Sequence, residues 1–124
     1  MMVPVDPSTP EEYFRDDALG LEVFARVHAA LVATRPDVTV RVTRSQVAFR
    51  RRRAFAWLWE PGRYLRHPAA DVVLSLALDT RLASPRFTEV VHPGPWMHHL
   101  EVHAVEEVDD EVLGWLDAAA AEAG

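Results

Sequence analysis

The chain has 124 residues and no cysteine, and its formal net charge is −6. This length fits one domain (residues 1–124) that buries a core without disulfides. The missing thiols exclude thiolate nucleophiles and thiolate zinc sites, and the negative charge disfavours a general nucleic-acid binder. The chain shows no secretory signal and no apolar run near the roughly 18 residues of a membrane span, so we expect a cytoplasmic protein.

Two helices are predicted in the first third of the chain. Residues 1–8 contain Pro and Ser without periodicity and are predicted to form a loose lead-in. Thr9-Pro10-Glu11-Glu12 matches a capping box, in which Thr9 accepts a hydrogen bond from the amide of Glu12, and predicts a short helix. A longer helix is predicted from about Asp17 to Arg35, because apolar residues recur there at spacings of three and four. Pro36 ends it.

Alternating and apolar runs in the middle of the chain predict strands. Val38, Val40 and Val42 alternate with polar residues, which is the period of a half-buried strand. Gln46–Phe49 and Ala54–Trp59 flank four arginines, so we predict a hairpin with an arginine tip. A loop over residues 60–70 and a strand over residues 71–78 follow.

The last third of the chain is predicted to contain one more strand and a closing helix. Ser84-Pro85 indicates one short helical turn, and His92-Pro93-Gly94-Pro95 indicates a rigid connector. Trp96–His103 alternates as a strand, and an apolar stripe from Val105 to Ala119 predicts a final helix of about fifteen residues. The predicted fold class is therefore α+β, with an antiparallel sheet of about five strands packed against N-terminal and C-terminal helices.

Five short motifs carry a resemblance to a known family. They are Val42-Thr43-Arg44-Ser45, Phe55-Ala56-Trp57, Leu82-Ala83-Ser84-Pro85-Arg86, Trp96-Met97-His98-His99 and Asp109-Asp110-Glu111-Val112-Leu113. With these motifs the chain resembles a bacterial family called domain of unknown function 5655, from about residue 14 to 121. The resemblance implies a fold and a short list of positions, and it implies no activity. The order of elements is also similar to that of YjbR-type domains, in which helices wrap an antiparallel sheet.

The arginine tip, Arg50–Arg53, is the sharpest charge feature of the sequence. Guanidinium groups bind phosphate and carboxylate through paired hydrogen bonds. On the next strand Phe55, Trp57 and Trp59 are expected to share one face, which would form a stacking platform if it is open to solvent. The alternative is that the aromatic side chains belong to the core and the arginines form a solvated turn or are neutralised by the acidic C-terminal segment.

Histidines of the last predicted strand are the next candidates. His99, Glu101 and His103 are expected to project from one face, so they form either a divalent metal site or a solvated outer face. His98 is expected on the opposite face. There, a buried and hydrogen-bonded histidine and a general base are the two interpretations.

Together these features predict a non-catalytic binding module for an anionic or aromatic ligand, such as a nucleotide, an organic anion or a short single strand. Arg44 and Ser45 lie in the turn between the first two strands and are expected to face the same cleft as His99. The alternatives are an enzyme with His98 or His99 as general base, and a homodimer formed through the aromatic strand. No cofactor, metal or catalytic residue is assigned. The predicted ligand-binding residues are Arg44, Ser45, Arg50, Arg51, Arg52, Arg53, Trp57, Trp59, His98 and His99.

Overall fold

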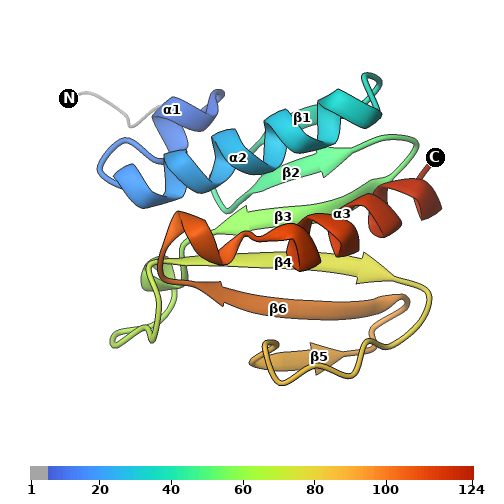
Figure 1. The fold of residues 1–124 in the computed structure, drawn as a ribbon. Helices are drawn as coiled ribbons and strands as arrows, with labels where there is room; N and C mark the ends of the chain where they lie inside the picture. The colour runs from blue at the N-terminus through green and yellow to red at the C-terminus, as the bar shows by residue number, and fades with distance from the viewer. Residues whose placement is uncertain (1–5) are drawn as a thin grey trace.

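A computed structural model describes residues 6–124, so most of the predicted lead-in lies outside the described residues. Six strands form one antiparallel sheet in the order β1-β2-β3-β4-β6-β5 (Figure 1). The strands are β1 (Thr39–Val42), β2 (Val47–Arg50), β3 (Ala54–Trp59), β4 (Val72–Leu78), β5 (Glu89–Val91) and β6 (Trp96–Val102). The helices are α1 (Pro10–Tyr13), α2 (Ala18–Thr34) and α3 (Asp110–Glu122), with the 3-10 turns η1 (Pro61–Arg63) and η2 (Val105–Glu107). The α+β class is confirmed, and the sheet has six strands rather than about five.

Side-chain caps fix where the helices begin. The predicted capping box is present, with Thr9 Oγ1 accepting from the Glu12 amide at 3.1 Å. Asp17 caps α2 through the Gly20 amide at 2.8 Å, as the predicted boundary implies. The final helix was predicted to begin near Val105, but α3 begins at Asp110 because Asp109 is extended and caps it.

Two short segments differ from the prediction. Glu89–Val91 was assigned to no element, but these residues pair with β6 as an edge strand. Ser84-Pro85 forms a turn rather than a helical turn, in which Ser84 Oγ accepts from the Arg86 amide at 3.2 Å. Here the Ser84 side chain takes up the Arg86 amide locally, and such side-chain contacts to the backbone compete with helix formation.

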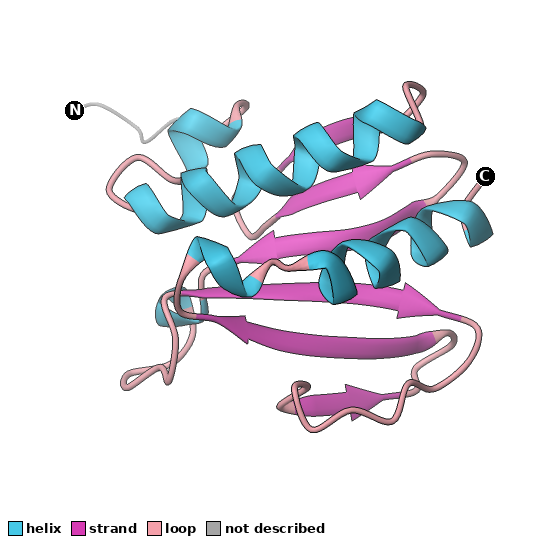
Figure 2. Ribbon diagram, in the orientation of Figure 1, coloured by secondary structure: helices cyan, strands magenta, loops and turns pink. Residues whose placement is uncertain are grey.

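Helices α2 and α3 lie over one face of the sheet, in front of the strands in Figures 1 and 2. We call this the covered face. Strand side chains that are fully buried on it include Phe49, Leu58, Leu74, Leu76 and His98. Removing this apolar surface from water is the main favourable contribution to folding. None of the helices in the described part of the chain is long and apolar enough to cross a membrane.

The opposite face of the sheet carries no α-helix among residues 6–124, and we call it the open face. Trp57, Trp59, Met97 and His99 lie on it and stay partly exposed. Neighbouring strands place Trp57 opposite Ser75, and Ser75 opposite His99. The open face therefore presents aromatic and polar side chains from three adjacent strands side by side.

Phe55 is the residue at which the predicted alternation of β3 fails. The β2–β3 register shifts between Phe49, which pairs with Ala56, and Arg50, which pairs with Ala54. Phe55 is thus an extra residue of β3, as in a β-bulge, which redirects a side chain. It is 1% exposed and belongs to the core, so the prediction that it shares a face with the two tryptophans is wrong.

Candidate ligand-binding site on the open face

A hollow of about 310 Å³ lies on the open face, and we call it the aromatic hollow. Strand β3 contributes two tryptophans, β4 a serine, and β6 a methionine and a histidine. The β1–β2 turn and the loop after β3 form its rim. The lining residues are Ser45, Gln46, Trp57, Trp59, Tyr64, Ser75, Met97 and His99.

A chain of hydrogen bonds runs along the floor of the aromatic hollow. Trp59 Nε1 donates to Ser75 Oγ at 2.8 Å, and Ser75 Oγ lies 2.6 Å from His99 Nδ1. Because an indole nitrogen only donates, the proton of Ser75 remains free to be donated to His99. When Ser75 is the donor to Nδ1, a neutral His99 carries its own proton on Nε2, from which it can donate to another group.

The environment of His99 favours the neutral imidazole. Burial lowers the pKa of His99, an effect that nearby Glu89 opposes and His98 reinforces. Glu89 is also the cross-strand partner of His99 on β5. At neutral pH the side chain therefore acts as an uncharged hydrogen-bonding group rather than as a fixed cation.

Aromatic rings form the walls of the hollow. The Trp59 ring lies 6.2 Å from the Tyr64 ring and 6.2 Å from the His99 ring, both in edge-to-face geometry. Tyr64 is 59% exposed, and its hydroxyl donates to the Ser45 carbonyl at 3.2 Å. This contact fastens the rim of the hollow to the β1–β2 turn while one side of the Tyr64 ring stays in solvent.

The structure brings together four of the predicted site residues: Ser45, Trp57, Trp59 and His99. It adds Tyr64 and Ser75, which sequence reasoning missed. Ser75 had a signal, since it is the only polar residue in the run Val72–Leu78. A lone hydroxyl in an apolar strand needs a partner when it is buried.

His98 does not reach the aromatic hollow. It lies on the covered face and is 0% exposed, against the Phe87 ring at 4.9 Å. Its Nε2 accepts from the Leu82 amide at 3.0 Å, and its Nδ1 lies 3.4 Å from the Leu76 carbonyl. Burial lowers the pKa of His98. Both ring nitrogens are engaged within the protein, so the geometry gives His98 a structural role.

Most of the arginine tip is engaged by the C-terminal end of α3. Arg51 donates to the Asp37 carboxylate at 3.0 Å and to the Ala120 carbonyl at 2.7 Å. The backbone amide of Arg52 donates to the Ala123 carbonyl at 2.9 Å. A cation at a helix C-terminus satisfies free carbonyls and interacts favourably with the helix dipole. The tip therefore anchors α3 to the β2–β3 hairpin.

The remaining predicted arginines are not part of the aromatic hollow. Arg44 is 80% exposed and pairs with Asp6 at 3.1 Å. Arg53 lies 3.9 Å from Asp79 at the end of β4. The acidic C-terminal segment also pairs with an arginine outside the tip, since Arg35 lies 3.3 Å from Asp117 of α3.

The three residues considered for a metal do not converge. His99 faces Ser75, while His103 lies beyond the end of β6 and is 3.8 Å from Glu101. Over residues 6–124, no group of three or more His, Asp or Glu side chains is placed to hold a metal ion.

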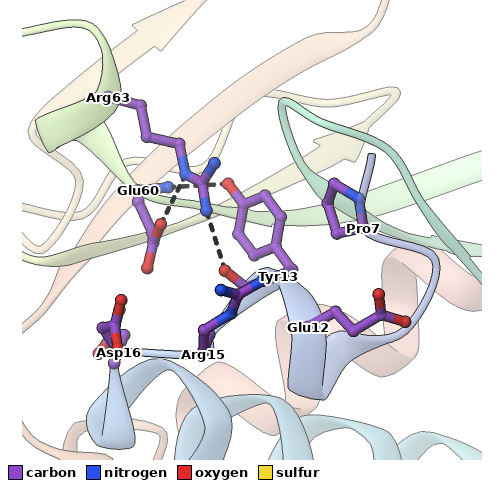
Figure 3. Close-up of a pocket in the computed structure, with 8 residues that line it drawn as sticks. Pro7, Glu12, Tyr13, Arg15, Asp16, Glu60 and Arg63 are labelled. Atoms are coloured by element: carbon purple, nitrogen blue, oxygen red, sulfur yellow. Dashed lines mark hydrogen bonds and ion pairs between the residues drawn. The ribbon is translucent and has the colours of Figure 1, made fainter. Parts of the chain in front are cut away.

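A polar cleft of about 300 Å³ is lined by residues of α1, of the loop that follows it and of η1 (Figure 3). The Arg63 guanidinium sits 4.2 Å above the Tyr13 ring and donates to Glu60 at 2.6 Å. Burial raises the pKa of Tyr13 to about 12, so its hydroxyl stays protonated and donates to the Ser45 carbonyl at 3.0 Å. These groups satisfy one another's hydrogen-bonding capacity. The bond from Tyr13 to Ser45 joins α1 to the rim of the aromatic hollow.

The chain has no match among curated proteins or solved structures. A family model with the description Domain of unknown function (DUF5655) matches residues 11–121, a range that includes the aromatic hollow. Two of the five motifs that carry the family resemblance meet in space, where the Arg86 guanidinium pairs with the Asp109 carboxylate at 2.9 Å. The chain therefore belongs to the family of domains of unknown function 5655.

Proposed function

We propose that this domain is a non-catalytic, cytoplasmic binding module that holds a flat aromatic group in the aromatic hollow. The observation that carries the proposal is the convergence of Trp57, Trp59, Tyr64 and His99 on a sheet face without an α-helix over it in the described chain. Apolar walls with a few convergent polar groups, in a volume of about 300 Å³ or more, are typical of small-molecule sites.

Each part of the hollow has a distinct role in this proposal. The tryptophans supply flat apolar area, and stacking of one ring on such a surface contributes about 1–3 kcal/mol. His99 Nε2 donates a hydrogen bond to an acceptor on the ligand. Ser75 fixes the imidazole through the 2.6 Å contact to Nδ1, which keeps Nε2 as the donor.

The aromatic hollow has no arginine among the described residues that line it. Affinity for the ring is therefore expected to come from stacking and one hydrogen bond rather than from charge. Binding of a neutral aromatic ligand should be nearly independent of salt, whereas a single strand held through its phosphates would be released by salt.

The test uses quinoline and naphthalene, which have similar shapes but differ in one ring acceptor. Wild-type protein should bind quinoline about 2–10-fold tighter, since a net hydrogen bond contributes about 0.5–1.5 kcal/mol. Replacement of His99 by Phe should abolish this difference in affinity, measured by calorimetry or NMR titration. Trp57→Ala should lower the affinity for both ligands.

Trp96→Ala is the matched control, because Trp96 stacks on His92 at 4.0 Å and does not line the aromatic hollow. Binding that is equally weakened by Trp96→Ala and Trp57→Ala would contradict the proposal. No binding of either ring, together with a light-scattering mass of two chains, would favour the homodimer instead.

A second candidate function is an enzyme in which His99 transfers a proton to or from the bound ligand. The 2.6 Å contact between Ser75 and His99 favours it, because a polar partner orients the imidazole. Ser75 itself is 2% exposed and already bonded to Trp59, so it suits an orienting role better than attack on a ligand. A ligand recovered chemically unchanged after long incubation with wild-type protein would argue against this candidate.

A further inference from the structure

A second hollow of about 390 Å³ adjoins the aromatic hollow, and we call it the charged hollow. Its lining includes Arg53, Ala77, Asp79 and Pro95, and it shares Trp57 with the aromatic hollow. We propose that the ligand is an aromatic anion, whose ring occupies the aromatic hollow and whose carboxylate or phosphate binds Arg53. This inference rests on the proposed function and names the class of its ligand.

The two hollows are neighbours on the open face, since both are lined by Trp57 and since Ala77 of one pairs with Met97 of the other. Ser75 and Ala77 are successive open-face residues of β4, and they pair with His99 and Met97 of β6. One such step along a strand is about 7 Å. Small side chains at Ala54 and Ala77 leave space beside Trp57. A ligand that spans the hollows therefore needs a linker of several atoms between its ring and its anionic group.

Arg53 is the arginine of the tip that lines the charged hollow, and its ion pair with Asp79 is loose. It lies 3.9 Å from Asp79, and their side chains are 59% and 69% exposed. An exposed pair at this separation is weak. Arg51, by contrast, has a 17% exposed side chain and two short contacts. A guanidinium such as that of Arg53 can exchange its carboxylate partner for a carboxylate or phosphate of the ligand.

Asp79 opposes the ligand's charge and competes for Arg53. Its backbone amide donates to the Glu122 carboxylate at 3.1 Å, so its position does not depend on its own side chain. Removal of the Asp79 charge should therefore strengthen binding of an anion without displacing the end of β4. The same change should leave a neutral ligand unaffected.

The experiment uses quinoline with a three-carbon chain that ends in a carboxylate, a phosphate monoester or a primary amide. Wild-type protein should bind both anionic forms about 5-fold tighter than the amide, as expected for a partly exposed ion pair. Arg53→Gln should remove this preference, and Asp79→Asn should increase it. Affinities are measured by calorimetry at low salt, and higher salt should reduce the preference.

Arg52→Gln is the matched control, because it removes the same charge from a neighbouring residue that lines neither hollow. It should keep the preference for the anions. Equal binding of anion and amide by wild-type protein would overturn this inference and leave the proposed function standing. Failure of every quinoline compound to bind would overturn the proposed function itself. A carboxylate attached directly to the ring should show no dependence on Arg53, because it cannot reach the charged hollow.

Discussion

His98 and His99 are neighbours in the sequence, yet they belong to opposite faces of the sheet. His98 lies on the covered face, with both ring nitrogens near backbone partners at 3.0 and 3.4 Å. His99 lies on the open face, with Nδ1 held by Ser75 at 2.6 Å and its ring lining a hollow. The pKa of each imidazole is lowered, in each case chiefly by burial.

The comparison shows that burial and a shifted pKa do not by themselves identify a binding residue. What distinguishes the two histidines is whether the protein uses all of their hydrogen-bonding capacity. A side chain whose partners all come from the fold stabilises the fold. A side chain that is oriented at one end and free at the other can recognise a ligand.

The largest expected loss of stability comes from a substitution on the covered face. Phe49 is 0% exposed and stacks on Phe24 at 5.6 Å. Phe49→Ala should lower the free energy of unfolding by about 3–5 kcal/mol, since it removes buried apolar area and leaves a cavity. Trp57→Ala on the open face should cost about 1 kcal/mol, as partly exposed positions usually do. Urea unfolding measures both, and similar losses would contradict the distinction between the faces.

The two histidines give the sharpest test of the comparison. His98→Leu leaves the Leu82 amide without its acceptor, so it should lower the free energy of unfolding by about 1–3 kcal/mol. Quinoline binding by the folded variant should be unchanged. His99→Leu should have the reverse pattern, with a smaller loss of stability and loss of the preference for quinoline over naphthalene. A His98 variant that loses binding while remaining folded would break the comparison.

Stability measured as a function of pH should show the lowered pKa values that the two histidines share. Because their pKa values are lower in the folded protein than the ordinary value of 6.5, the unfolded chain binds protons first as pH falls. The histidines' contribution to the free energy of unfolding should therefore hold steady above about pH 6.5 and decrease below it. Urea unfolding of His98→Leu should show a shallower decrease, and an unchanged slope would contradict the role of His98.

The smallest expected difference in stability is between variants of two arginines, Arg51 and Arg44. Arg51→Gln removes the contacts to Asp37 and the Ala120 carbonyl, and should lower the free energy of unfolding by about 1–2 kcal/mol. Arg44→Gln removes an exposed pair with Asp6 and should change stability by less than about 0.5 kcal/mol. Thermal unfolding at matched salt compares them, and equal shifts would contradict the anchoring of α3.

The sequence by itself determined the local elements of this protein. Thr9 and Asp17 mark helix starts because a capping side chain needs only its own next few amides. Alternation in β3 correctly placed Trp57 and Trp59 on one face because side-chain direction follows from the strand repeat. The hairpin with an arginine tip was also predicted from local sequence, because its two strands are adjacent in the chain.

Tertiary structure decided what depends on pairing between distant segments. The bulge at Phe55 arises from the register between β2 and β3, and the short strand β5 exists only because β6 offers it an edge. The Ser75–His99 pair joins residues on β4 and β6 whose register no local pattern encodes. Likewise, only the position of the C-terminal end of α3 determined that Arg51 serves the fold and left Arg53 beside the open face. Local propensity fixes the direction of a side chain, whereas the partner that it meets is fixed by the packing of the whole sheet.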